Sequence, residues 1–455
     1  MTKIKWHAII PLVLSILLVL FLNQLLWNQL IIVVTTIWVI YFWATNVVNK
    51  LYSSILLLLS FLFFSQMSVG DLLGIALSDT ILLIITTQLI AYGMMRLSFI
   101  QDIIAKPLQK NPSIRKLMIF PYLIGGVLIL FIPQAFARLI LMGSIMNELL
   151  QNTNIKSDKV RAVINLNNAF AITLTSMFIP NGDIVLNHAA INFSNDIVGT
   201  ELTTLTWGLY MIVPTLVLCA VMLLVMKFGF KKELSEMKEP LVMYPTDVTN
   251  NKNSNQSLII GAVVFMVIAW MTESIHMVPA WIPAVIVIAV LLFTDVLKWS
   301  DFKRLNLTFL VFIVTAFSVG TGMSMAGLTD ILANMLESFP ISDQAVLILI
   351  AVSLLAIVFH MIVGSSVATM SIILPIVTSL QTIDPSMLVS ITLSVYIMVN
   401  IQFVLPHHHA SLMIGIGENF YKQSDMLKLG LIMTVLAIPI LLLLYISWWS
   451  ILSLL

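Results

Sequence analysis

The stretch FIPQAFAR, residues 131–138, interrupts a long apolar run near residues 120–150 with a proline, a glutamine and an arginine. A second interruption, GSSVAT at residues 364–369, lies inside the apolar run near residues 345–381. Lipid tolerates such broken backbone only where protein or a water-filled cavity satisfies the freed amide and carbonyl groups. Both runs are therefore predicted to be re-entrant hairpins, which enter the membrane and turn back.

The composition is that of a membrane protein. Apolar residues fill 60% of the 455 positions and charged residues only 9%, whereas a soluble protein needs roughly a quarter of its residues charged. A net charge of +1 provides no basic face for nucleic acid, and the single cysteine, Cys219, excludes a disulfide framework. Without a phosphate-binding loop, a zinc-ligand spacing or a nucleophile motif, we expect neither a cofactor nor an enzyme.

Apolar runs long enough to cross a bilayer, about 20 residues each, recur along the chain. With the two hairpins left out, they cover approximately residues 7–26, 30–46, 51–67, 76–97, 160–185, 205–226, 257–274, 280–297, 307–325, 386–412 and 429–450. We therefore predict an all-α polytopic membrane protein with about eleven transmembrane helices and two re-entrant hairpins.

Positive charges predict the orientation, because cytoplasmic loops collect lysine and arginine. When the N-terminus is placed inside, all 22 lysines and arginines except Arg138 fall on the cytoplasmic side. We expect a multi-pass protein of a bacterial plasma membrane, with a cytoplasmic N-terminus and an extracytoplasmic C-terminus. The first hairpin would open to the cytoplasm and the second to the outside, so the two halves would be inverted.

Four motifs recur in the same order, each between 226 and 231 positions further along the chain. The pairs are WATN 43–46 with WMTE 270–273, Gly93-Met94 with Gly322-Met323, 131–138 with 362–369, and 180–183 with 406–409. The predicted organisation is an N-terminal helix at 1–29, a first repeat at 30–230, a cytoplasmic linker at 231–256 and a second, inverted repeat at 257–455. Inverted repeats with interrupted helices are typical of secondary transporters, which hold their substrate near the midplane.

Further motifs give the chain a resemblance to a known family. The second hairpin contains Ser365, Ala368-Thr369 and Leu374-Pro375, and the tail ENFYKQSDMLKLG occupies residues 418–430. With the tryptophan motifs, these features resemble the divalent anion/sodium symporter family, within the citrate/arsenite permease-like ion transporter superfamily, from about residue 30 onward. The resemblance implies a homodimeric anion carrier, with residues 51–67 and 205–226 at the subunit interface.

In that family each hairpin tip carries Ser-Asn-Thr and binds both sodium and carboxylate. This chain has Ser366 and Val367 in place of the Asn and Thr of the second tip, and Gln134-Ala135-Phe136 at the first. Carried over by position, the expected substrate-binding residues are Gln134, Ala135, Arg138, Asn181, Gly182, Ser365, Ser366, Thr369, Pro406, His407 and His408. Asp183, His407 and His409 are the expected groups for ion or proton coupling.

Arg138 occupies the second threonine position of the first tip, where an arginine costs about 2.5–3.5 kcal/mol to insert. It should therefore face a cavity or a partner. One interpretation is an ion pair with Asp183 or Glu148, since buried charges are usually paired. The other is direct contact with the anion, as a fixed cation that stands where a sodium ion would sit. A fixed cation would suit a sodium-independent exchanger or uniporter.

The histidine run at 407–409 allows several interpretations. Consecutive helical residues point about 100° apart, and neither a cysteine nor a carboxylate cluster accompanies the run, so we expect no metal site. The histidines could pack at an interface, contact substrate or couple transport to protons, because histidine titrates near neutral pH.

The sequence predicts a secondary active transporter, whether exchanger, uniporter or ion-coupled carrier, of a small organic or inorganic anion. Its expected partners are the anion, the lipid bilayer and a second copy of the chain, with protons or sodium as the possible coupling ions. An alternative is a flippase for a lipid-linked cell-envelope substrate, or a membrane partner of an envelope-polymer synthase. The apolar Phe136 and Val367 at the two hairpin tips would suit such a cargo.

Overall fold

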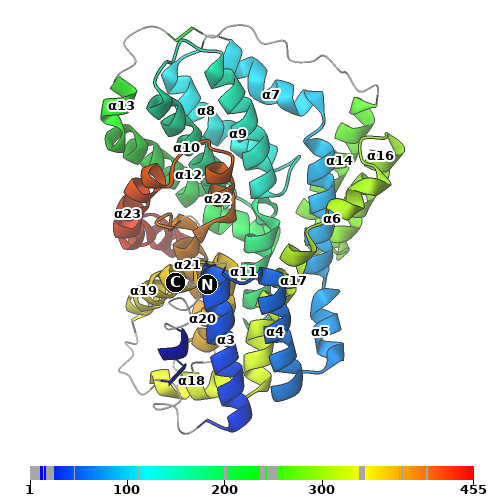
Figure 1. The fold of residues 1–455 in the computed structure, drawn as a ribbon, viewed down its shortest axis with the longest axis vertical. Helices are drawn as coiled ribbons and strands as arrows, with labels where there is room; N and C mark the ends of the chain where they lie inside the picture. Colours follow the sequence, from blue (N-terminus) through cyan, green and yellow to red (C-terminus); the bar gives the residue numbers. More distant parts are fainter. Residues whose placement is uncertain are drawn as a thin grey trace. The chain divides into compact units, whose positions relative to one another are not determined.

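The computed structural model describes residues 11–13, 15–16, 25–45, 47–110, 112–198, 202–235, 241–242, 255–337, 344–378, 380, 383–405 and 408–454. Its regular structure is helical (Figure 1), which confirms the all-α prediction. Most of the predicted N-terminal helix, and most of the linker at 231–256, lie outside the described residues. At the start of that linker the structure has a short helix, α13 (Lys231–Ser235).

Several helices are long and apolar enough to cross a membrane. Four qualify singly: α12 (Thr204–Gly229), α17 (Leu307–Met325), α19 (Ala345–Val363) and the continuous stretch Gln423–Ile451. That stretch comprises α23 (Gln423–Ile440), the π-helical η5 (Leu441–Ile446) and α24 (Ser447–Ile451). A fifth candidate is a pair bent by 40°, α5 (Val69–Ala76) and α6 (Asp79–Met94). The chain is a polytopic membrane protein, and the finer expectation of eleven crossings stays a prediction.

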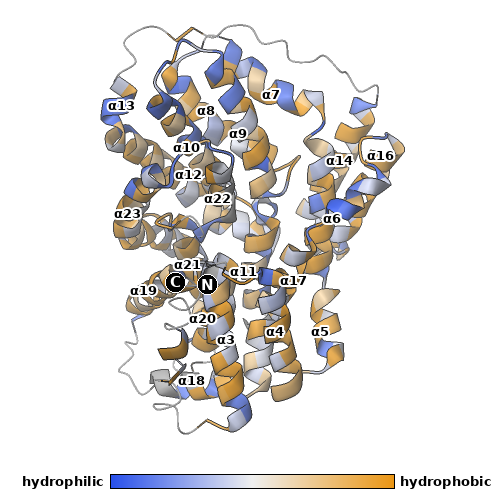
Figure 2. Ribbon diagram, viewed as in Figure 1, coloured by the Kyte–Doolittle hydropathy of each residue, from blue (hydrophilic) through white to orange (hydrophobic). Residues whose placement is uncertain are grey.

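Shorter apolar helices accompany them: α3 (Trp27–Thr45), α4 (Lys50–Phe64), α14 (Gln256–Met271), α16 (Trp281–Phe293), α20 (Ser366–Thr378) and α21 (Leu388–Ile401). The remaining connecting elements are α7 (Ser98–Gln109), α15 (Glu273–His276), η2 (Trp299–Arg304), α18 (Leu328–Glu337) and η3 (Pro385–Met387). Figure 2 shows hydrophobic residues along nearly every helix, as a surface that faces lipid requires.

Both predicted hairpin runs are broken helices. The run near 120–150 is α8 (Ile114–Leu128) and α9 (Ala135–Gln151), separated by residues 129–134. The run near 345–381 is α19 and α20, separated by Gly364 and Ser365. Gly364 has φ +64°, a left-handed conformation that glycine adopts without strain.

A second kind of break follows each hairpin. After the first, α10 (Asp158–Thr175) ends and η1 (Pro180–Gly182) leads into α11 (Ile184–Val198). After the second, α21 gives way at Ile401 and α22 (Ala410–Gly417) follows. Polar residues inside apolar runs thus mark four helix interruptions in the described chain.

The helices group into two compact units, each of which combines segments that are far apart in the sequence. The first unit comprises Met1–Ile81, Asn192–Thr200 and Asn306–Val399. In it α4 lies between α3 and α17, and α20 packs on both α17 and α19. The ring of Phe61 covers Gly322, where a Cβ atom would lie 2.6 Å from the ring. The glycine of this repeated Gly-Met motif therefore permits close helix packing.

The second unit comprises Leu82–Ile191, Glu201–Leu305 and Asn400–Leu455. Helix α10 is its centre, with α8, α9, α12 and α22 packed around it. The rings of Phe170 on α10 and Phe403 in the second break contact each other, with centroids 4.7 Å apart. Contacts around α10 therefore hold the first hairpin, the first break and the start of the second break in one unit.

The repeated tryptophan has the same structural role in both units. In the first unit the indole N–H of Trp43 donates to Ser54 Oγ at 3.2 Å, which ties α3 to α4. In the second unit the indole N–H of Trp270 donates to the carbonyl of Ala280 at 2.8 Å, which ties α14 to the start of α16. Each indole therefore fixes the connection between two consecutive helices.

Candidate functional site

Arg138, in the first turn of α9, is fully buried and joins the first hairpin tip to the first helix break. Its Nη1 donates to the carbonyl oxygen of Ile132 at 2.7 Å. Its Nη2 donates to Ser176 Oγ at 2.9 Å and to the carbonyl oxygen of Gly182 at 2.5 Å. Three uncharged oxygens from the tip, the end of α10 and the break therefore surround one guanidinium.

The carboxylates that the sequence suggested as partners are not bonded to this guanidinium. Within the described chain, Arg138 has no carboxylate oxygen within 4.0 Å. Glu148 is exposed, and Asp183 attracts the guanidinium only from a greater distance. Asp183 instead begins α11: its carboxylate accepts a long hydrogen bond, 3.4 Å, from the amide of Leu186, and its carbonyl accepts from Asn187.

The first break is held by two side chains that were not among the predicted site residues. Asn187 Nδ2 donates to the carbonyls of Ser176, at 2.8 Å, and Ile179, at 2.9 Å. Trp207 on α12 donates its indole N–H to the carbonyl of Met177 at 3.0 Å. These bonds satisfy carbonyls that the interrupted helix leaves free, as the membrane interior requires. Asn187 could have been predicted as a support of the break, because it is a polar residue about one helical turn after it.

Gly182 is required by the path of the backbone. A Cβ atom there would lie 2.1 Å from the carbonyl oxygen of Ser176, far inside contact distance. The Oδ1 of the preceding Asn181 accepts a hydrogen bond from His188 Nε2 at 3.1 Å. Both predicted site residues of this break are therefore buried beside the group that holds Arg138.

Gln134 and Ala135 form the start of α9, and both are buried. Gln134 Nε2 makes only long contacts, 3.4 Å to the carbonyl of Ile84 and 3.5 Å to Thr87 Oγ1. Its Oε1 has no hydrogen-bond partner in the part of the chain that the structure describes. Helices α9 and α11 thus both begin beside residues that Arg138 contacts. Their N-termini carry partial positive charge and therefore attract negative groups.

The second hairpin lies in the first unit. Thr369 Oγ1 and His360 Nδ1, both fully buried, are 3.2 Å apart and link α20 to α19. Ser366 Oγ donates to the carbonyl of Val399 at 3.5 Å, and Ser365 Oγ accepts from the amide of Ala368 at 3.5 Å. The three predicted residues of this tip are therefore brought together around the start of α20.

The histidine run is partly described. Pro406 and His407 lie outside the described residues. His408 is buried, and its Nδ1 accepts from the amide of Leu405 at 3.4 Å. His409 packs its ring on Phe403, with centroids 5.4 Å apart. Among the described side chains no group of three or more histidines, cysteines or acids could hold a metal ion.

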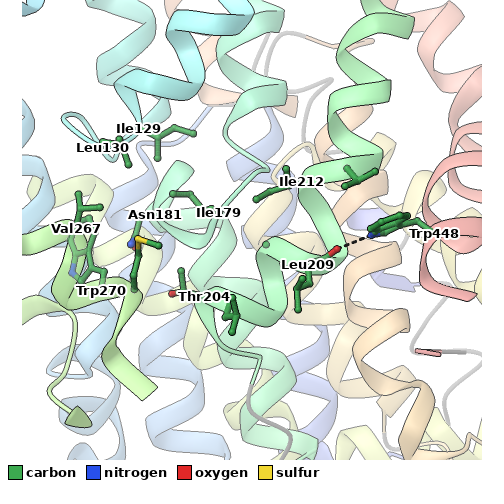
Figure 3. A pocket seen from close by; sticks show the side chains of 14 residues that line it. Ile129, Leu130, Ile179, Asn181, Thr204, Leu209, Ile212, Val267, Trp270 and Trp448 are labelled. Carbon is green, nitrogen blue, oxygen red and sulfur yellow. Dashed lines mark hydrogen bonds between the residues drawn. The ribbon is translucent and has the colours of Figure 1, made fainter. Parts of the chain in front are cut away.

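A cavity of about 380 Å³ lies next to the first break in the second unit. Figure 3 shows its lining, with Ile179 and Asn181 of the break near Trp270 and α12. The wall is fixed in part by Trp448, whose indole N–H donates to the carbonyl of Leu209 at 2.7 Å. The lining residues are almost all apolar and none is charged. With Asn181 and Thr204 as its only polar side chains apart from the two indoles, and with no cation, this cavity is poorly suited to an anion.

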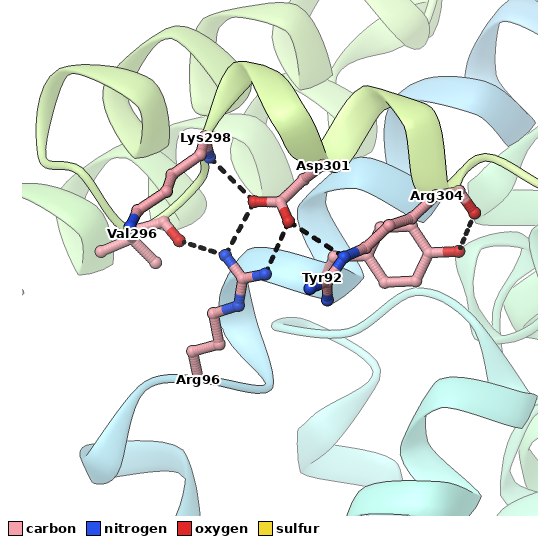
Figure 4. A network of polar contacts seen from close by, with 6 residues as sticks. All are labelled: Tyr92, Arg96, Val296, Lys298, Asp301 and Arg304. Carbon is pink, nitrogen blue, oxygen red and sulfur yellow. Dashed lines mark hydrogen bonds and ion pairs between the residues drawn. The ribbon is translucent and has the colours of Figure 1, made fainter.

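A polar cluster that sequence reasoning missed lies at the end of α6 (Figure 4). Arg96 donates to both carboxylate oxygens of Asp301, at 2.7 and 2.8 Å, and also to the carbonyl of Val296 at 2.9 Å. Arg304 Nε lies 3.2 Å from the same carboxylate. The hydrogen bonds from Arg96, with one from the backbone of Lys298, hold the pKa of Asp301 well below its usual range.

Comparison with known proteins agrees with this architecture. No curated protein sequence matches the chain. The family model described as the sodium:sulfate symporter transmembrane region matches residues 2–455, nearly the whole chain. The chain therefore belongs to the sodium:sulfate symporter family, whose members are ion-coupled secondary transporters of anions and not enzymes.

Proposed function

We propose that this protein carries a small oxyanion or carboxylate across a bacterial plasma membrane by alternating access between two inverted repeats. The repeats at 30–230 and 257–455 would be preceded by the N-terminal helix and joined by the linker at 231–256. The N-terminus would lie in the cytoplasm, as the positive charges predict. The observation that carries the proposal is Arg138, a fully buried cation at a helix break inside a membrane domain.

Three positive features converge around this break. Arg138 contributes a full charge, and the N-termini of α9 and α11 each contribute roughly half a charge. Asp183 at the start of α11 offsets part of this field. Broken helices whose N-termini point at the anionic group of the substrate are a recurring design of secondary transporters. The local field therefore favours a negative solute near Gln134, Ala135, Asn181 and Gly182.

The second hairpin, in the first unit, carries neutral donors suited to an anion. Ser365, Ser366 and Thr369 carry hydroxyls at the start of α20, whose N-terminus is also suited to an anion. His408, and His407 with Pro406 from the undescribed part of the break, would add contacts from the second half. Hydroxyls and amides bind oxyanions by hydrogen bonds without adding charge, which keeps the loaded carrier near neutrality.

We also propose a homodimer. The N-terminal half of α12 presents Leu205, Leu209 and Leu216, each at least half exposed, on the second unit. Such an apolar face suits either lipid or a second copy. The family resemblance favours the second copy at this helix.

Reconstituted transport tests the proposal. Liposomes that contain the purified protein would be loaded with unlabelled sulfate. Their uptake of labelled sulfate, phosphate and succinate would be compared with that of protein-free liposomes. The expected result is saturable uptake of at least one of these anions and none of succinamide, an uncharged analogue of succinate. Succinamide uptake as fast as that of the anions, or anion uptake no faster than in empty liposomes, would contradict an anion carrier.

A further inference from the structure

We infer that the apolar cavity lined by α12, α14 and the first break binds one acyl chain of a membrane phospholipid. All of its lining residues belong to the second unit. Asn181 is the one residue that this wall shares with the proposed anion site. The wall carries no charge, so the lipid chain would lie beside the anion and would not replace it. The inference therefore does not depend on which anion is transported.

The first support is the chemistry of the wall. The indole N–H groups of Trp270 and Trp448 are already donated to backbone carbonyls, at 2.8 and 2.7 Å. The Oδ1 of Asn181 accepts from His188. A hydrocarbon chain gives up no hydrogen bonds when it enters such a wall, whereas a polar solute gives up those that it makes to water. The chemistry of the cavity therefore selects an apolar ligand.

The second support is the size of the cavity. Its lining on α12 runs from Thr204 to Val213, about 14 Å at 1.5 Å per residue. One leaflet accounts for half of a hydrocarbon core that is about 30 Å thick, so the two lengths agree. Thr204 is also the first residue of α12, which places this end nearest the membrane surface. The volume of about 380 Å³ is more than twice that of an apolar cavity of about 150 Å³ that binds benzene.

The third support is access from the bilayer. Leu205 and Leu209 on α12 and Met271 on α14 line the cavity, and each is at least half exposed. Side chains that belong both to the wall and to the outer surface mark a mouth, and in a bilayer this mouth meets acyl chains. Leu205 and Leu209 also belong to the face that we assign to a second copy. Met271 does not, so the mouth extends beyond that face.

A bound chain would pack directly on the first break. Figure 3 shows Ile179 and Asn181 of the break between Trp270 on one side and Trp448 on the other. A chain that fills the space among them touches the break, α14 and the last helix at once. Because an unfilled gap loses the dispersion contacts that its walls could make, the lipid would complete the packing around the break.

A photoreactive phospholipid tests the inference. The purified protein would be reconstituted in phosphatidylglycerol liposomes that contain a trace of the same lipid with a diazirine in one acyl chain. Illumination and peptide mass spectrometry would then identify the labelled residues. Ile129 and Trp270 line the cavity but are buried, so label on them reports a chain inside it. Both should be labelled in the wild-type protein, and absence of label from both overturns the inference whether or not any variant folds.

Gly208→Phe fills the cavity from its own wall. A Cβ atom at Gly208 makes only an ordinary contact, 3.4 Å from Ile212 Cδ1, so the larger side chain can enter the empty space. Label on Ile129 and Trp270 should fall at least about tenfold, which corresponds to about 1.4 kcal/mol of binding free energy. Gly261→Phe on α14 is the matched control, because a Cβ there meets nothing within 4 Å and the residue does not line the cavity. It should keep the wild-type labelling, and equal labelling of the two variants overturns the inference.

The same preparation distinguishes a lipid from a second copy of the chain. If a second copy filled the cavity, lipid would label neither Ile129 nor Trp270, and Gly208→Phe would lower the fraction of dimer. That outcome overturns the inference. Anion uptake is measured separately, so a failure of the lipid site leaves the proposed function intact, and a failure of anion uptake leaves the labelling result intact.

Discussion

Arg96 and Asp301 form a two-pronged contact across 205 positions of sequence, with both guanidinium Nη atoms on the two carboxylate oxygens at 2.7 and 2.8 Å. The contact joins the C-terminal end of α6 to η2 (Figure 4). The Asp301 side chain is only 3% exposed although that of Arg96 is 36% exposed. Planar pairing of this kind fixes orientation as well as distance.

Replacing Asp301 by asparagine should destabilise the second unit. The change leaves Arg96 and Arg304 facing a neutral amide, and the loss of stability should be about 1.5–3 kcal/mol, as for hydrogen bonds to charged groups. Thermal unfolding in detergent measures it. Asp102→Asn is the matched control, because Asp102 pairs with a Lys106 side chain that is 65% exposed, and such surface pairs contribute at most about 1 kcal/mol. Equal effects of the two variants would contradict a special role for Asp301.

The same contact predicts an acid-labile part of the stability. Because Arg96 lowers the pKa of Asp301 in the folded state, its contribution is fully present above the ordinary carboxylate pKa of about 4. It is lost as the pH falls through the lower folded-state value. The unfolding temperature of the wild-type protein should therefore fall more steeply below about pH 4 than that of Asp301→Asn. Parallel curves for the two proteins would show that Asp301 is not the group responsible.

Gly182→Ala should disrupt the first break. Its new methyl group would meet the carbonyl oxygen of Ser176 at 2.1 Å, so the break must open and Arg138 must lose at least one acceptor. We expect anion exchange to fall at least about tenfold, the rate change that corresponds to about 1.4 kcal/mol. Gly261→Ala is the control, since a Cβ there meets nothing within 4 Å. Unchanged exchange in Gly182→Ala would contradict the assignment of this break to the site.

The contact between Thr369 and His360 predicts a similar contrast in the second hairpin. Thr369→Val keeps the shape of the side chain but removes the hydroxyl that lies 3.2 Å from His360 Nδ1. It leaves a buried polar ring atom without this partner, at a cost of about 1–3 kcal/mol. Thr369→Ser keeps the hydroxyl and should retain most of the activity. The measurement is the exchange rate at saturating anion, which should be lower for Thr369→Val than for Thr369→Ser. Equal rates for the two variants would show that transport does not need the hydroxyl.

The helix interruptions could be predicted from the sequence because they depend on the types of residue at the break itself. Proline, glycine and hydroxyl residues inside apolar runs mark the breaks at 129–134 and at Gly364, where the structure has them. The sequence predicts one crossing for the run at 160–185, whereas its helix ends at Thr175 and α11 starts at Ile184. This apolar run can be interrupted inside the membrane because a buried side-chain donor, Asn187, replaces the helical hydrogen bonds lost at the break.

The partners of Arg138 could not be predicted in the same way. In a sequence, only acids can be recognised as partners of opposite charge for an arginine. The structure supplies carbonyls of Ile132 and Gly182 instead, and every residue has a carbonyl. Which carbonyls are free depends on where the helices break and how the segments meet. The contact of Arg96 with Asp301 could not be predicted either, because nothing in the local sequence relates two positions so far apart.

Two buried serines give a last contrast, with opposite expected signs. Ser176 Oγ accepts from Arg138 and donates to the carbonyl of Ile172 at 2.6 Å, so Ser176→Ala should destabilise the protein by about 1–3 kcal/mol. Ser353 on α19 is fully buried, and its hydroxyl has no hydrogen-bond partner among the residues that the structure describes. Ser353→Ala removes that unsatisfied group and should be neutral or stabilising. Thermal unfolding of the two variants measures both effects, and a large loss in Ser353→Ala would mean that this hydroxyl has a partner that the two units do not provide.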